Sequence, residues 1–223
     1  MIEVNDCFEI GSSHMVCQDY TLSGEIQKEY GLFHYGIVCD GCSSSKDTDL
    51  GARFLALAAR RILNNDDVLS KIFSIQADVL GKIIIDTVRE YPEYDHLYKN
   101  ASFDSTMLLF IANEGLYRII FFGDGCAYVE DNGKRIFSLE YSENAPPYLS
   151  YKLDYDRTWG YVSKFGPSDK NVNVWNITDP HQPTLEANYS TKVGESPYFD
   201  ITGEITNLKQ ISIFSDGIYS FKY

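Results

Sequence analysis

The sequence predicts an α+β fold, a central β-sandwich of two mainly antiparallel sheets flanked by helices in αββα layers. Apolar runs of strand length come first, two stretches with helical spacing follow, and strands then return. This order lacks the regular alternation of strand and helix that a doubly wound fold requires. The length of 223 residues suits one hydrophobic core, so we expect residues 1–223 to form a single domain.

The first strands are short and end at turn residues. "CFEIG" and "DYTLSG" each end at glycine, and "LFHYGIVCD" has the continuous apolar composition of a strand buried on both faces. These segments predict strands over 7–11, 19–24 and 32–40.

Two helices are predicted next. Asp47 begins a run of helix-starting residues, and Leu50 and Phe54 begin an apolar face with helical spacing. A second helix is predicted over 68–90, with an apolar side that Gln76 interrupts once.

Strands return in the second half of the chain. "STMLLFIAN", "LYRIIFFGD" and "CAYVED" predict three strands, and "DNGK" predicts a tight hairpin turn after them. Residues 140–200 are rich in Tyr, Pro, Asn and Asp and predict irregular loops that join short strands at 158–166 and 172–177. "QISIFSDG", at 210–217, repeats the pattern of an apolar strand followed by Asp-Gly.

The composition excludes several classes of function. The formal net charge of −13 argues against a nucleic-acid partner, which needs a basic face, and is compatible with a cation site. No uninterrupted apolar run is long enough for a membrane span, and the N-terminus does not resemble a secretion signal. Five cysteines without a secretory context predict reduced thiols, so we expect a cytoplasmic protein.

Four aspartates share one setting, because each follows an apolar segment at a predicted strand end. They are Asp19, Asp40, Asp124 and Asp216, and glycine directly follows the last three. A single Asp-Gly is a common turn. Carboxylates that converge at buried strand ends are costly unless a cation compensates them, and carboxylates with an exposed carbonyl suit Mg²⁺ or Mn²⁺.

Five motifs in order give the chain a family resemblance. "GSSHMVCQDY", "VCDGCSSSKDTDLGA", "DSTMLLFI", "FFGDG" and "IFSDG" resemble those of the metal-dependent serine/threonine phosphatases of type 2C, the PPM family, in a bacterial-type branch. The resemblance spans essentially the whole chain, and residues 140–200 match least. It implies a β-sandwich with two metal ions, Mg²⁺ or Mn²⁺, at one end, and possibly a third.

The resemblance also implies roles for individual residues. Asp40 would bridge both metals, the carbonyl of Gly41 would bind one of them, and Asp216 would be the second shared carboxylate. Asp19 would hold a metal-bound water, and Asp124 is a candidate ligand for the further, weaker metal. The implied catalytic residues are therefore Asp19, Asp40 and Asp216.

The implied reaction is hydrolysis of phosphoserine and phosphothreonine in proteins. A metal-activated water attacks phosphorus in line, and no covalent phosphoenzyme is needed. The implied partner is a phosphoprotein substrate, without nucleic acid or membrane. The alternative is a non-catalytic relative that uses the same sandwich as a binding or regulatory module.

Three positions depart from the family pattern. His14 stands where many members have the arginine that grips the substrate phosphate, so it is the candidate phosphate-binding residue, though a packed histidine fits equally. Cys42 replaces a histidine that is a proposed general acid. The family places another metal-binding aspartate after its last Asp-Gly motif, but here Tyr223 comes seven residues after Asp216. We therefore expect either a shortened chain or a natural short form with an altered metal site.

Two further patterns, one short motif and a set of cysteines, allow more than one interpretation. "LDYDRT", at 153–158, matches the Asp-x-Asp-x-Thr of haloacid-dehalogenase phosphatases but lacks the preceding apolar strand. Four cysteines lie within two positions of a predicted site aspartate: Cys17, Cys39, Cys42 and Cys126. They are either small apolar packing residues or thiols made reactive by a nearby cation.

Overall fold

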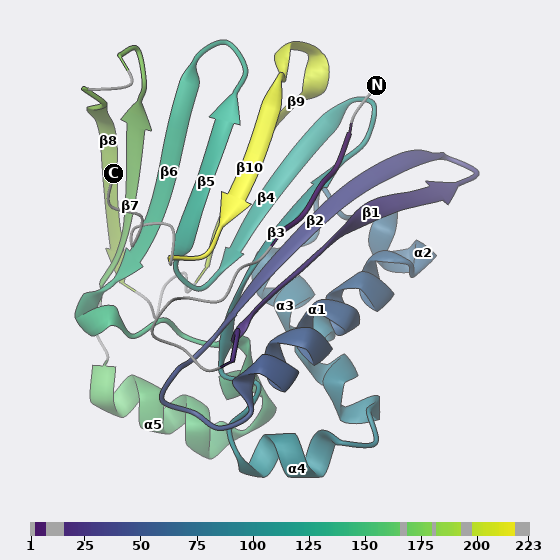
Figure 1. Cartoon of the computed structure of the whole chain (residues 1–223), viewed down its shortest axis with the longest axis vertical. Helices are drawn as coiled ribbons and strands as arrows, with labels where there is room; N and C mark the ends of the chain where they lie inside the picture. The colour runs from purple at the N-terminus through teal and green to yellow at the C-terminus, as the bar shows by residue number, and fades with distance from the viewer. Residues whose placement is uncertain (1–2, 8–15, 166–168, 180–181, 193–197, 217–223) are drawn as a thin grey trace.

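Two five-stranded antiparallel sheets form the protein (Figure 1). The structure is a computed structural model that describes residues 3–7, 16–165, 169–179, 182–192 and 198–216. The first sheet has the order β1-β2-β3-β4-β9 and the second the order β10-β5-β6-β7-β8. The predicted α+β sandwich of antiparallel sheets is confirmed.

The strands of the first sheet are β1 (Asp19–Lys28), β2 (Gly31–Gly41), β3 (Ser105–Ala112), β4 (Leu116–Phe122) and β9 (Phe199–Glu204). Those of the second are β5 (Gly125–Glu130), β6 (Lys134–Tyr141), β7 (Asp169–Asn176), β8 (Thr184–Lys192) and β10 (Gln210–Phe214). The predicted "DNGK" hairpin joins β5 to β6. Of the predicted strand over 7–11, only Cys7 is described, and it lies in no strand; the rest lies outside the described residues.

The protein has two hydrophobic cores, and β3 contributes side chains to both. All eight of its residues are buried, as expected for a central strand covered on both faces. Met107, Leu109 and Ile111 face the core beneath the helices, whereas Leu108 and Phe110 face the core between the two sheets. Period-two alternation along one strand therefore serves both layers.

The helices lie against the first sheet and at one end of the sandwich (Figure 1). α1 (Thr48–Leu63) and α3 (Ala77–Thr87) pack on the outer face of the first sheet, and α4 (Tyr94–Lys99) follows them. α5 (Tyr155–Phe165) lies below the strand ends in this view. Among the described residues, no helix is long and apolar enough to cross a membrane.

The predicted helix over 68–90 is wrong in its extent. The chain forms the short α2 (Asp66–Leu69), then turns, and α3 starts only after Gln76. The carbonyls of Ile72 and Ile75 accept hydrogen bonds, both of 2.7 Å, from Nη1 of the buried Arg118 on β4. These two carbonyls lie in the turns between α2 and α3 and bond to the buried Arg118 guanidinium, so they are not available to a continuous helix.

The predicted strand at 158–166 is also wrong, because its described residues, 158–165, belong to α5. Asp154 precedes the helix, and its carboxylate accepts the backbone N–H of Asp156 at 2.8 Å, while its carbonyl accepts that of Thr158. Tyr161 and Phe165, one helical turn apart, pack against the core between the sheets. The loop-rich region predicted for 140–200 therefore contains a helix and two full strands, while the strand predicted at 172–177 lies mainly in β7.

Candidate functional site

Two of the predicted aspartates form the terminal pair of a β-ladder. Asp19 opens β1 and lies directly opposite Asp40 near the end of β2. The two side chains point to the same face because directly opposed residues of an antiparallel pair share a face. Two carboxylates on adjacent strands repel each other, so this position requires a compensating proton or cation.

Asp216 comes to the same place from the second sheet. It follows β10, and its carboxylate hydrogen-bonds with the Asp40 side chain, which also hydrogen-bonds with Asp19. Burial, the Asp19 charge and these hydrogen bonds raise the pKa of Asp40 from 3.8 to about 10. Without a cation, Asp40 therefore holds a proton at neutral pH and donates it to a neighbouring carboxylate.

Asp124 occupies the turn between β4 and β5 at the same end of the sandwich. Gly125 follows it with φ of 144°, and a Cβ there would lie 2.9 Å from the carbonyl oxygen of Phe214, so the turn needs glycine. Burial and the charge of Asp216 raise the pKa of Asp124 from 3.8 to about 7. The charge of Asp216 therefore acts on Asp124.

The structure thus brings all four predicted aspartates to one end of the sandwich. Figure 1 shows this end at the bottom, where β1 starts, β2 and β10 end, and the β4–β5 turn lies. Gly41 is the last residue of β2 and is buried beside them. His14, the candidate phosphate-binding residue, lies outside the described residues.

Sequence reasoning missed a second polar group beside this end. Asp104 immediately precedes β3, and its carboxylate binds Arg157 of α5 at 2.6 and 2.7 Å. One signal was present, because Asp104 stands next to a mostly apolar strand, as the other aspartates do. Arg157 lies in the "LDYDRT" segment, where the structure shows a helix cap in place of a dehalogenase motif.

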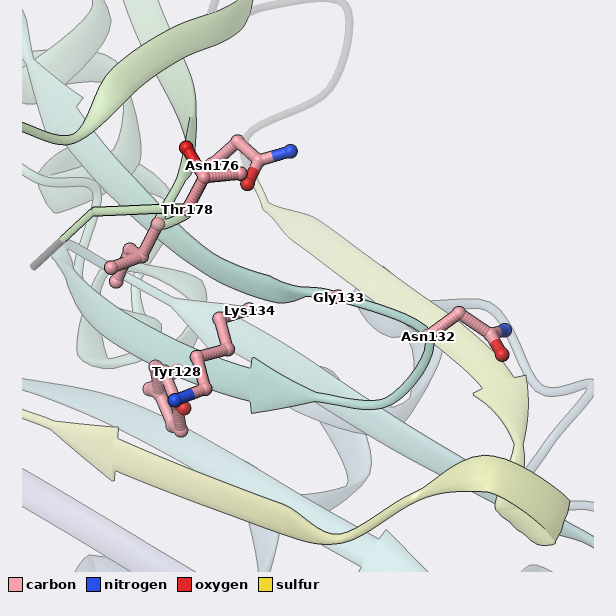
Figure 2. Close-up of a pocket in the computed structure, with 7 residues that line it drawn as sticks. Tyr128, Asn132, Gly133, Lys134, Asn176 and Thr178 are labelled. Carbon is pink, nitrogen blue, oxygen red and sulfur yellow. The ribbon is translucent and has the colours of Figure 1, made fainter.

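A pocket of about 590 Å³ lies elsewhere on the molecule. It is formed at the tip of the β5–β6 hairpin and the end of β7, and Figure 2 shows its lining of Tyr128, Asn132, Gly133, Lys134, Asn176 and Thr178. This hairpin tip is at the opposite end of the second sheet from Asp124, which precedes β5. None of the four aspartates lines it, so the pocket is no part of the candidate site.

A comparison with protein-family models assigns the chain to a family. The family model described as protein phosphatase 2C matches residues 10–222. The chain belongs to the protein phosphatase 2C family. This confirms the predicted family and supports a protein phosphatase. A comparison with curated proteins finds no match.

Solved structures of bacterial serine and serine/threonine phosphatases share the fold. The serine/threonine phosphatase Stp1 from Staphylococcus aureus is 13% identical, with a TM-score of 0.50 over 96% of this chain and 76% of that one. A bacterial serine phosphatase is also 13% identical, with a TM-score of 0.51 over 96% of this chain and 78% of that one. At these identities the likeness concerns the fold alone.

Phosphatase 2C membership implies dependence on divalent metal ions in general. The donor chemistry fits such ions, since hard cations prefer carboxylate oxygens; burial first, and then the charge of Asp19, raise the pKa of Asp40. Within the described ranges, no three His, Cys, Asp or Glu side chains form a set that could hold a metal as they stand.

Proposed function

We propose that the protein is a Mg²⁺- or Mn²⁺-dependent phosphatase that hydrolyses phosphoserine and phosphothreonine in proteins. Family membership supports a phosphatase. The observation that carries the metal dependence is the Asp19–Asp40–Asp216 contact, which joins carboxylates from both sheets at one end of the sandwich. Two bound ions are proposed, with a third near Asp124.

The residues have distinct tasks in this proposal. Asp40 and Asp216 would hold the cations, and Asp19, opposite Asp40 on the neighbouring strand, would hold the water. The Gly41 carbonyl supplies one further oxygen, and His14 is the proposed phosphate-binding residue. When bound, divalent cations lower the pKa of water and neutralise charge on the phosphoryl oxygens.

The clustering of these carboxylates, of which Asp19, Asp40 and Asp216 are half-buried and Asp124 is buried, opposes the alternative of a non-catalytic binding module. Like charges that face each other across a strand pair reduce stability, and burial increases that penalty. A protein that used the sandwich only as a docking surface would have no need of Asp40 at this position. In the catalytic proposal, bound cations compensate the repulsion between these carboxylates.

The test uses hydrolysis of an aryl phosphate with Mn²⁺. Its good leaving group needs no general acid, so Cys42 does not limit the rate. We expect Asp40→Asn to reduce kcat at least about 100-fold, because loss of even an outer-shell partner of a metal costs 10–100-fold. Asp86→Asn is the matched control, since Asp86 pairs with Lys82 on the exposed surface of α3.

Substrate class is tested with phosphopeptides. We expect Mn²⁺-dependent phosphate release from phosphoserine and phosphothreonine peptides, and a much lower rate from matched phosphotyrosine peptides. Inactivity of the Mn²⁺-loaded protein on aryl phosphate and on every peptide would contradict the proposed function and favour the binding module.

A further inference from the structure

The peptide group between Gly41 and Cys42 is held through its own N–H, and both flanking peptide groups are held as well. The Cys42 N–H donates to the carbonyl of Asp104 at 2.8 Å, and the Cys42 carbonyl accepts the Thr48 hydroxyl at 3.2 Å. The Gly41 N–H donates to the Gln18 carbonyl at 3.2 Å. A Cβ on Gly41 would lie 2.8 Å from Cβ of Thr48, so only glycine fits.

Fixing the Cys42 N–H also fixes the Gly41 carbonyl. The peptide group is planar and trans, so its N–H and C=O point in opposite directions. The contact with Asp104 therefore determines where the Gly41 oxygen is directed. This is the oxygen proposed above as a metal ligand.

Asp104 is itself held by charge. Its side chain is almost fully buried, and its carboxylate accepts Ser150 Oγ at 2.6 Å in addition to Arg157 Nη2. Ser45, in the turn that follows Cys42, donates to the same carboxylate at 3.4 Å. Arg157 lies over the Tyr151 ring, 5.0 Å from its centroid. Side chain and backbone of Asp104 thus join α5 to the turn after β2.

We infer that the Asp104–Arg157 pair positions the Gly41–Cys42 peptide, so that Arg157 is a positioning residue for the metal site. The inference rests on the proposed function, because only there does the Gly41 oxygen have a ligand's task. Arg157 contacts neither the four aspartates nor Gly41 in any described hydrogen bond or ion pair; its action passes through Asp104.

Removal of Arg157 would leave a buried carboxylate without its cation. Such a group is relieved by movement toward water or by uptake of a proton, and each shifts the residue that bears it. Movement of Asp104 would carry its carbonyl away from the Cys42 N–H. The turn after β2 would then lose the contact that fixes its first peptide.

The first experiment measures amide hydrogen exchange at Cys42 in the metal-free protein by NMR. We expect Arg157→Ala to accelerate this exchange about tenfold or more, because a lost local contact lowers the free energy of local opening. Arg157→Lys should restore most of the protection, since one nitrogen, Nη2, contacts both carboxylate oxygens. In the double variant Asp104→Asn/Arg157→Ala, the Cys42 amide should exchange more slowly than in Arg157→Ala alone, because no charge is left unpaired.

Arg135→Ala is the matched control. Arg135 pairs with Asp131 at 2.6 Å, is similarly exposed, and lies over the Phe137 ring at 5.5 Å, but at the far hairpin. It should leave Cys42 exchange within about twofold of the unsubstituted protein. Equal acceleration by Arg135→Ala and Arg157→Ala, or no acceleration by Arg157→Ala and Arg157→Lys, would overturn the positioning role.

The second experiment measures Mn²⁺ affinity by calorimetry. We expect Arg157→Ala to weaken binding about tenfold and Arg135→Ala to leave it unchanged, as outer-shell substitutions do. Unchanged affinity in Arg157→Ala would overturn the link to the metal site. Failure of the unsubstituted protein to bind Mn²⁺ would instead overturn the proposed function, and the metal-free exchange data would still decide the positioning role.

Discussion

Asp19 and Asp40 face each other across the first pair of the β1–β2 ladder, so two carboxylates share one face of the sheet. Their separation is set by backbone pairing and cannot be relaxed by rotation of one strand alone. A proton on Asp40, whose pKa is about 10, reduces this repulsion. The Asp40 side chain hydrogen-bonds with the carboxylates of both Asp19 and Asp216. Proton and metal therefore compete for the same oxygens, which leads to the first two predictions.

The stability of the metal-free protein should fall as pH rises. The unfolded chain releases the Asp40 proton near pH 3.8, whereas the folded chain keeps it until about pH 10, so the unfolded state is favoured progressively across that window. Asp124 adds the same trend between pH 3.8 and about 7. Thermal unfolding in EDTA should therefore give a decreasing Tm from pH 5 to pH 9.

Asp40→Asn should flatten this trend above about pH 7, since asparagine does not titrate. The exposed Asp86→Asn variant should retain the slope of the unsubstituted protein. A Tm that rises between pH 7 and pH 9 in EDTA would show that the carboxylate cluster is not protonated in the folded state.

Metal binding should release protons. A cation can bind Asp40 only after its proton leaves, so Mn²⁺ affinity should increase with pH, by up to about tenfold per unit for each proton released. Calorimetry in two buffers with different ionisation enthalpies measures the number of protons. Identical heats in both buffers at pH 7 would rule out a protonated Asp40, and Asp40→Asn should release fewer protons than the unsubstituted protein.

Arg118 should matter for stability and not for activity. It is buried, pairs with Asp200 at 2.7 Å, and also donates to the carbonyls of Ile72 and Ile75 between α2 and α3. Arg118→Ala would leave these partners unpaired. Urea denaturation should show that it lowers the free energy of unfolding by about 3–5 kcal/mol. Arg61→Ala, which breaks the exposed pair with Glu90, should change it by less than about 1 kcal/mol.

The activity of Arg118→Ala, corrected for the folded fraction, should equal that of the unsubstituted protein. Arg118 lies near the start of β4, whereas Asp124 lies beyond its end. A large loss of kcat in the folded fraction would show that the α2–α3 turns affect the site directly.

The thiols beside the aspartates should differ in reactivity. Cys39 is fully buried, and burial and the Asp40 charge raise its pKa; Cys126 is also buried. At the half-exposed Cys42, burial raises the pKa but hydrogen bonds with Ser44 and Tyr148 outweigh it and lower the pKa. Iodoacetamide should therefore label Cys42 well before Cys39 and Cys126 in native protein.

The exposed Cys7 is the internal reference for access, and urea-unfolded protein is the control for intrinsic reactivity. In urea all five thiols should label at similar rates. Equal labelling of Cys39 and Cys42 in the native protein would mean that the end of β2 opens on the time scale of the reaction.

The sequence carried the information for the four aspartates because their setting is local. An apolar strand followed by Asp-Gly can be read within eight residues, as at 210–217. The Asp104–Arg157 pair could not be read this way, because the partners are 53 positions apart and one lies in a helix that was predicted as a strand. The break before α3 was missed for the same reason, since its carbonyls bond to Arg118, which is 43 and 46 positions away.

The order of the four aspartates along the chain has a consequence for biosynthesis. The ribosome makes Asp19 and Asp40 early, Asp124 near the middle and Asp216 after β10. A nascent chain that has not reached β10 thus has its first carboxylate pair opposed but lacks the acceptor from the second sheet. If the four aspartates bind a cation as proposed, the full set can do so only late in folding, and the binding stabilises only chains in which both sheets have already packed together.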